Sequence, residues 1–184
     1  MATGKHLKIE FSKAGNNIKA VLFSCTAADF PYEKGDVVDL AVSVKRNEYL
    51  GRVSVNIIIK NIRFNGTDED RILTEFRLFE RLIRGENIYK DDAFALLPQR
   101  ELMANVYRFL RSREFWSYGE EVICKRIGEE RYGAVCVSIR AMLEMGLLAE
   151  TNGVLVVNKT TEKVNLEQAP VILKLKSFIE GVEK

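Results

Sequence analysis

Apolar and polar residues alternate one by one through the first third of the 184-residue chain. Because successive side chains of a strand point to opposite faces, this alternation predicts half-buried strands. Glycine and asparagine at residues 14–17 and again at 47–51 favour tight turns, so we expect two hairpins. The predicted strands cover residues 7–11, 18–22, 38–45 and 52–64.

The last of these strands is long and has two unlike faces. Val53, Val55, Ile57 and Ile59 share one face, whereas the other face carries polar and basic residues from Arg52 to Lys60. One face is therefore expected to pack inward while the other meets solvent or a ligand. Four or five twisted strands within about 60 residues indicate a small barrel of the oligonucleotide-binding (OB) type. We place four strands; a fifth would come from bending strand 52–64 into two or from residues before Met1.

From Thr67 onward the apolar spacing becomes helical. Ile72, Phe76 and Phe79 fall on one stripe, either Asp68 or Asp70 can cap its start, and Gly85 ends the helix. We expect an amphipathic connecting helix here.

The next segment reads as three helices followed by a hairpin. Ser117 and Glu120 resemble a capping box for the second helix, and Asn152-Gly153 is a strong hairpin signal. Three helices and a hairpin form a winged helix-turn-helix. The predicted fold is thus α+β, with an OB-type barrel (1–65), a helical linker (66–97), a winged-helix domain (98–160) and a C-terminal tail with a last helix (161–184).

Composition excludes several classes of protein. No apolar run approaches the ~18 residues of a membrane-spanning helix and no secretory signal opens the chain, so we expect a cytoplasmic protein without a membrane partner. Cys25, Cys124 and Cys136 are too widely spaced for a CxxC motif and read as small buried hydrophobes. With His6 as the only histidine, histidine-rich metal centres and Ser-His-Asp chemistry are disfavoured.

Positive charge gathers in the strand-rich part. Residues 1–65 contain ten Lys/Arg against six Asp/Glu, whereas the remainder contains 18 against 20. Basic grooves with aromatic rings hold single-stranded nucleic acid, although solvated cations on an ordinary sheet give the same composition. The candidate nucleic-acid-binding residues are Lys5, His6, Lys8, Lys45, Arg46, Asn47, Tyr49, Arg52, Asn56 and Lys60. Tyr49 and His6 would stack on bases, and phosphates would be neutralised by Lys5, Lys8, Arg46, Arg52 and Lys60.

The third helix of the predicted winged helix is poorly suited to recognising duplex DNA. Arg131 and Arg140 stand beside Glu129, Glu130 and Glu144, and the hairpin has no basic residue. Recognition helices need donors for base edges and cations for phosphates. We therefore favour contact with a protein, or scaffolding, over duplex reading for this domain. The adjacent carboxylates Glu129-Glu130, like Asp91-Asp92, read as solvated helix caps rather than a metal or acid–base pair.

Four short motifs carry a family resemblance. In order and spacing, residues 4–8 (GKHLK), 35–39 (GDVVD), 47–52 (NEYLGR) and 59–63 (IKNIR) resemble the OB domain of RecJ, the single-stranded-DNA-specific exonuclease. The part that follows looks like the C-terminal extension of some members. The family's motifs carry over to Lys5, His6 and Lys8 and to Asn47, Tyr49, Gly51 and Arg52. Asn61 departs from the pattern, because the family usually has an acidic residue there.

The resemblance implies a parent enzyme of DNA recombination and repair that degrades single strands from the 5′ end. Its Mn²⁺ or Mg²⁺ would be held by DHH and DHHA1 domains, and no Asp-His-His occurs in this sequence. For the chain itself we expect no catalytic residue, no metal ligand and no cofactor, but single-stranded DNA as partner. The alternatives are a winged-helix transcriptional regulator, whose barrel would serve for dimerisation, and a protein-interaction module. A free-standing hydrolase is disfavoured.

Overall fold

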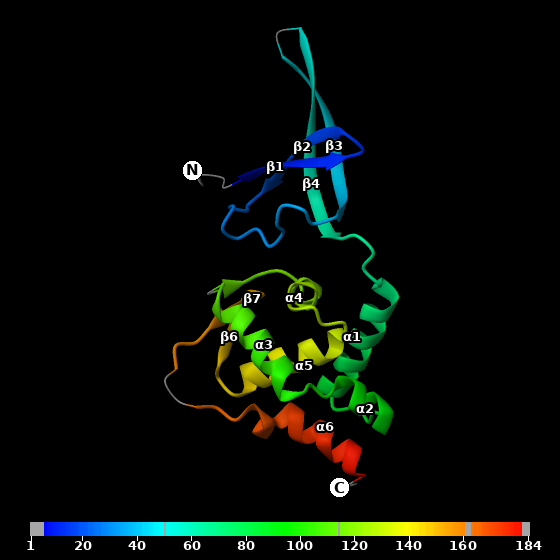
Figure 1. Cartoon of the computed structure of the whole chain (residues 1–184), viewed down its shortest axis with the longest axis vertical. Coiled ribbons are helices and arrows are strands. Elements are labelled where there is room, and N and C mark those ends of the chain that lie inside the picture. The colour runs from blue at the N-terminus through cyan, green and yellow to red at the C-terminus, as the bar shows by residue number, and fades with distance from the viewer. Residues whose placement is uncertain (1–5, 50, 114, 161–162, 182–184) are drawn as a thin grey trace. The chain divides into compact units, whose positions relative to one another are not determined.

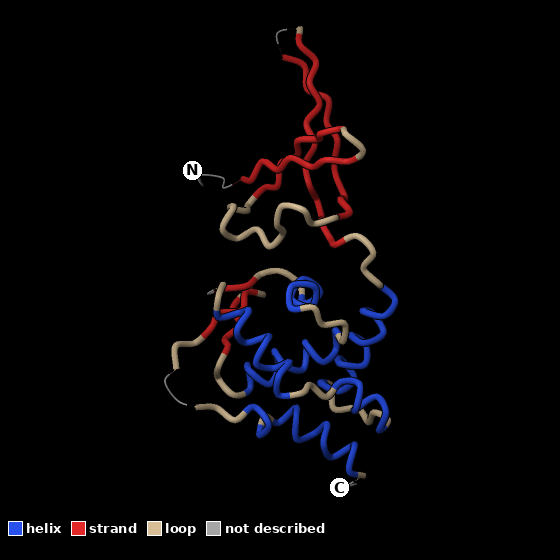
Figure 2. The backbone as a smooth tube through the Cα atoms, viewed as in Figure 1, coloured by secondary structure: helices blue, strands red, loops and turns tan. Residues whose placement is uncertain are grey.

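The chain divides into two compact units, Met1–Thr67 and Asp68–Lys184. The computed structural model describes residues 6–49, 51–113, 115–160 and 163–181. Among these residues, strands β1 to β4 lie in the first unit, and all α-helices and strands β5 to β7 lie in the second (Figures 1 and 2). The helices expected as a linker thus lie in the second unit.

The first unit is a four-stranded sheet with the order β1-β2-β4-β3. β1 and β2 pair antiparallel, as do β3 and β4, whereas β2 and β4 run parallel. Figure 1 shows β3 and β4 continuing as a twisted ribbon beyond β1 and β2. The four predicted strands are confirmed, and no fifth is found among the described residues of this unit. The strands are β1 (His6–Lys13), β2 (Asn16–Phe23), β3 (Val38–Tyr49) and β4 (Arg52–Phe64).

A bulge bends β4 without dividing it. Ala41 pairs with Asn61 but Val42 pairs with Ile59, which leaves Lys60 as an extra residue on β4. A bulge shifts the alternation of side chains by one position. Ile62, which pairs with Leu40, therefore shares the inner face with Ile59. Strand 52–64 thus bends but does not supply the fifth strand.

The inner face of the sheet is well buried only near β2 and the second half of β4. Ala20 is 1% exposed, Ile59 4% and Phe64 6%, and the ring of Tyr32 packs on Phe64 with a centroid distance of 4.9 Å. The hydroxyl of Tyr32 donates a hydrogen bond to the carbonyl oxygen of Ile62 over 2.8 Å. Along the ribbon the same face becomes exposed, and Val55 is 59% exposed.

The second unit consists of helices and a small antiparallel sheet with the order β5-β7-β6. Asn152 and Gly153 both have positive φ and join β6 to β7, which confirms the predicted hairpin. No described helix is both long and apolar enough to cross a membrane. The elements are α1 (Glu69–Ile83), α2 (Lys90–Leu96), α3 (Arg100–Arg111), β5 (Phe115–Trp116), α4 (Glu120–Ile127), α5 (Tyr132–Glu144), β6 (Leu148–Thr151), β7 (Val154–Val157), the 3₁₀ turn η1 (Leu166–Gln168) and α6 (Pro170–Glu180).

Helix α5 is the centre of the second unit. It contacts α1, α2, α3, α4 and α6 (Figure 1). Every residue of α5 from Tyr132 to Ile139 is buried, including Ser138, whose hydroxyl donates to the carbonyl oxygen of Ala134 over 2.7 Å. A helix that is apolar on almost all sides is buried rather than amphipathic.

Two helix starts tested the capping predictions. Asp68 caps α1 by accepting a hydrogen bond from the Arg71 amide over 3.0 Å, as one of the two predicted caps. The capping box at Ser117 is wrong, because α4 begins after Gly119 and has no side-chain cap.

The three cysteines are unpaired and buried, which confirms the prediction. Burial, with a smaller contribution from nearby carboxylates such as Glu129, raises the pKa of Cys124 to about 12. This thiol therefore stays protonated at neutral pH, as expected of a structural cysteine.

Gly133 allows α5 to approach α1 and α2 closely. A Cβ atom at this position would overlap Leu96 Cδ2 and would lie 3.5 Å from Glu75 Cβ. Because Leu96 is only 1% exposed, its side chain has little room to move.

Gly133→Ala is expected to lower the free energy of unfolding by about 1–3 kcal/mol through overpacking, despite the better helix propensity of alanine. Urea denaturation followed by circular dichroism measures the change. In a Leu96→Val background, which lacks the Cδ2 atom, the same substitution should cost little or stabilise the chain. An equal cost in both backgrounds would contradict the packing explanation.

Candidate nucleic-acid interface

One face of the first sheet carries exposed polar residues on β1 and on the β3–β4 ribbon, with the half-buried Val21 and Ile58 at its centre. We call it the outer face, opposite the buried Ala20 and Ile59. Strand pairing aligns Lys8 with Val21, Val21 with Ile58, and Ile58 with Ser43. Cross-strand partners share a face, so this row runs across the outer face from β1 to β3.

Five of the predicted binding residues share the outer face. His6 and Lys8 lie on β1, while Lys45 pairs with Asn56 and Asn47 pairs with Ser54 on the β3–β4 ribbon. All five are exposed. The sheet thus brings together cations and amides that come from both hairpins.

The other predicted residues are placed differently. Arg46 pairs with Val55 on the inner face and forms an ion pair with Glu48 over 3.5 Å, and Lys60 is the extra residue of the bulge. Lys5 lies outside the described residues. The backbones of Tyr49 and Arg52 pair at the end of the ribbon, but their side chains are also outside the description.

Within the described part of the chain, three cations among the predicted binding residues of this sheet make no ion pair. Lys8, Lys45 and Lys60 are exposed and make no ion pair with any described residue. Lys19 approaches Glu10 at 3.9 Å, but both side chains are at least half exposed. Such an exposed pair contributes little to stability. The outer face can therefore attract anions.

Phe23 is an aromatic residue of the outer face that the sequence prediction missed. It pairs with His6, is 56% exposed, and its ring centroid lies 6.1 Å from that of the imidazole. Exposed rings beside cations are the groups on which unpaired bases stack. The signal was present in the alternation, because Phe23 falls in phase with Lys19 rather than with the buried Ala20.

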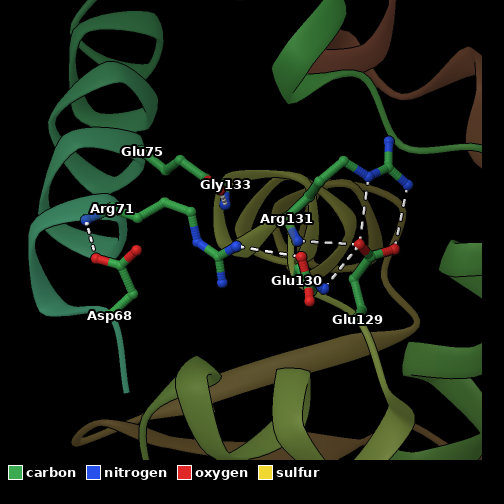
Figure 3. A network of polar contacts seen from close by, with 7 residues as sticks. All are labelled: Asp68, Arg71, Glu75, Glu129, Glu130, Arg131 and Gly133. Carbon is green, nitrogen blue, oxygen red and sulfur yellow. Dashed lines mark hydrogen bonds and ion pairs between the residues drawn. The ribbon is translucent and has the colours of Figure 1, made fainter. Parts of the chain in front are cut away.

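The N-terminus of α5, which would meet base edges in a recognition helix, is covered by α1 (Figure 3). Glu75 of α1 accepts a hydrogen bond from the Gly133 amide over 2.7 Å. Arg71 of α1 forms an ion pair with Glu130 over 3.3 Å. The first turn of α5 thus binds a carboxylate of its own chain.

Glu129 lies two residues before Arg131, the N-cap of α5, and α5 has no side-chain cap, so the interpretation of Glu129 as a helix cap is wrong. Its Oε1 accepts hydrogen bonds from the amides of Glu130 and Arg131, at 3.0 and 2.9 Å, and its Oε2 pairs with the Arg131 guanidinium at 3.1 Å (Figure 3). Burial alone would raise the pKa of Glu129, but these hydrogen bonds and the Arg131 charge lower it below its usual value. No group of three or more potential metal ligands occurs among the residues that the structure describes.

Comparison with known proteins identifies the first unit only. Residues 1–61 match the family model of the RecJ OB domain. The match supports a RecJ OB-domain region and, with it, nucleic-acid binding. No curated protein and no solved structure matches the chain.

Phe23→Ala is expected to change the free energy of unfolding by less than about 0.5 kcal/mol, because its ring lies on the exposed outer face. Phe64→Ala, which removes a ring from the inner face, should cost about 3–5 kcal/mol. Urea denaturation, followed by a signal that reports on the first unit, gives the free energy of unfolding of each variant. A large loss in Phe23→Ala would show a structural role for that ring.

Proposed function

We propose that this chain is a single-stranded DNA-binding region of a RecJ-type 5′–3′ exonuclease that acts in DNA recombination and repair. The observation that carries the proposal is the outer face, where Lys8 and Lys45 lie on the same face as the exposed Phe23, within residues that match a RecJ OB domain.

The strand topology supports this use of the outer face. The parallel pairing of β2 with β4 suits strands three and five of an OB fold, so β1 to β4 correspond to its strands two to five. OB folds bind oligonucleotides on the face of strands two and three and at the loop between strands four and five. His6, Lys8 and Phe23 belong to that face, and that loop corresponds to the connection between β3, which ends at Tyr49, and β4, which begins at Arg52.

The proposed mechanism is positioning of the strand. Lys8, Lys45 and Lys60 neutralise phosphates, and Phe23 gives a base a ring to stack on; Tyr49 is a second stacking residue by its place in the sequence. Hydrolysis and its Mn²⁺ or Mg²⁺ belong to domains that are not contained in these 184 residues.

We interpret residues 98–160 as a winged helix that contacts a protein partner or buttresses the enzyme. The order α3, β5, α4, α5, β6, β7 and the sheet order β5-β7-β6 support the winged-helix assignment. Its third helix, α5, is buried, and its exposed Arg140 pairs with Glu144 over 2.9 Å. These features disfavour a regulator that reads duplex DNA.

Fluorescence anisotropy with a labelled oligothymidylate and a duplex of equal length, repeated across salt concentrations, tests the proposal. Single strands should bind more tightly than the duplex. Lys45→Ala should reduce the slope of log affinity against log salt by about 0.7, the value of one lost phosphate contact. Phe23→Ala should weaken binding about five-fold or more, because a stacked base contributes roughly 1–3 kcal/mol.

Lys34→Ala is the matched control, because Lys34 is exposed in the loop before β3 and lies outside the sheet. It should leave affinity almost unchanged. Duplex preference would favour the regulator instead, and equal effects of Lys34→Ala and Lys45→Ala would remove the site assignment.

A further inference from the structure

A cavity of about 630 Å³ opens in the second unit beside α3. Its apolar lining includes Met103 and Leu147, both buried, and residues 163–167 line it together with α3. This volume is within the range of ligand sites in proteins.

One stripe of α3 faces the cavity. Arg100, Ala104, Tyr107 and Arg111 line it, and their spacing of four, three and four residues places them on one side of the helix. At 1.5 Å per residue, Arg100 and Arg111 are separated by about 16 Å along the helix axis, with Tyr107 between them. The stripe is therefore an extended row of cation, ring and cation.

Among the described residues of the unit, no acidic side chain pairs with the cations of this cavity. The side chains of Arg100, Arg111 and Lys163 line it and make no ion pair or hydrogen bond with any described residue. Glu167, which also lines the cavity, is already paired with Lys176 over 3.5 Å. The cavity is thus lined by three cations that are unpaired among the described residues and by one carboxylate that is already paired with Lys176.

The arrangement favours a phosphate-bearing strand over a compact anion. A helical nucleic-acid strand carries one charge per 3.4 Å, so about 16 Å spans several phosphates. Guanidinium groups match phosphate oxygens, and the half-buried Tyr107 ring offers a surface for a base. An acidic peptide would use the cations but would not need the ring.

We infer that this cavity is a second binding site for single-stranded nucleic acid, with phosphates on Arg100, Arg111 and Lys163 and a base on Tyr107. The inference rests on the proposed function for the identity of the ligand, but it concerns residues that the OB-domain match does not include.

The test measures binding of labelled oligothymidylate to the full chain across salt concentrations. Arg100→Ala/Arg111→Ala should reduce the salt slope by about 1.4, which corresponds to two phosphate contacts. Tyr107→Leu should weaken binding about five-fold or more. Arg108→Ala is the matched control: it removes one cation from the same helix, and Arg108 does not line the cavity but donates to Asn105 over 2.7 Å.

A second readout does not depend on affinity. Photo-crosslinking of a 5-bromouracil-containing strand, followed by peptide mapping, should label Tyr107. Crosslinks confined to the first unit would overturn the inference. As a control for folding, the melting temperature of each variant is measured and should equal that of the wild type.

The two proposals fail in different ways. If the wild-type chain binds no single strand, the proposed function fails and this inference fails with it. If Lys45→Ala reduces the salt slope but Arg100→Ala/Arg111→Ala behaves like Arg108→Ala, only this inference fails. If the double variant loses affinity for a poly-glutamate peptide but not for oligothymidylate, the cavity binds an acidic protein and the inference is overturned.

Discussion

The burial of α5 is the constraint around which the second unit is built. Helices α1, α2, α3, α4 and α6 all pack against it, and Gly133 permits the close approach of α1 and α2. The carboxylate of Glu75 reaches across from α1 to the first turn of α5, where the unpaired amides and the helix dipole favour an anion. A phosphate group would need the same position. The packing that stabilises this unit therefore also occupies the helix N-terminus at which a phosphate group could bind.

In the first unit the corresponding constraint is the alternation along the strands. It buries Ala20 and Ile59 on one face and places Lys8, Lys45 and Phe23 together on the other. Because Lys8, Lys45 and Phe23 are exposed, they are free to contact a ligand. The proposed binding surface is thus a direct result of the pattern that forms the strands.

Much of this architecture could be predicted from the sequence, because period-two alternation and Asn-Gly turns act locally. The strands, the Asn152-Gly153 hairpin and the Asp68 cap follow from neighbouring residues alone. The same alternation separates Lys45 from Arg46, since successive strand residues point to opposite faces. Composition alone grouped the two residues as binding candidates.

Other features depend on residues distant in sequence and gave no local signal. The bulge at Lys60 depends on how β3 pairs with β4, and the burial of α5 depends on helices that begin more than 60 residues before it and end more than 30 after it. The cavity beside α3 likewise needs residues 163–167, which follow α3 by about 50 positions. Cations on α3 could be counted in the sequence, but the wall opposite them could not be foreseen.

The uneven burial of the two units affects how the chain opens. The first sheet rests on few fully buried side chains, such as Ala20 and Ile59, and its ribbon exposes Val44 and Val55. Regions with few buried apolar contacts unfold locally at a lower free energy than well-packed cores. We therefore expect the backbone amides of β1 to β4 to exchange with solvent before those of α5, whose exchange should require unfolding of the helical unit. The two units are thus expected to behave as separate foldons, and the one with the proposed binding face should unfold at the lower free energy.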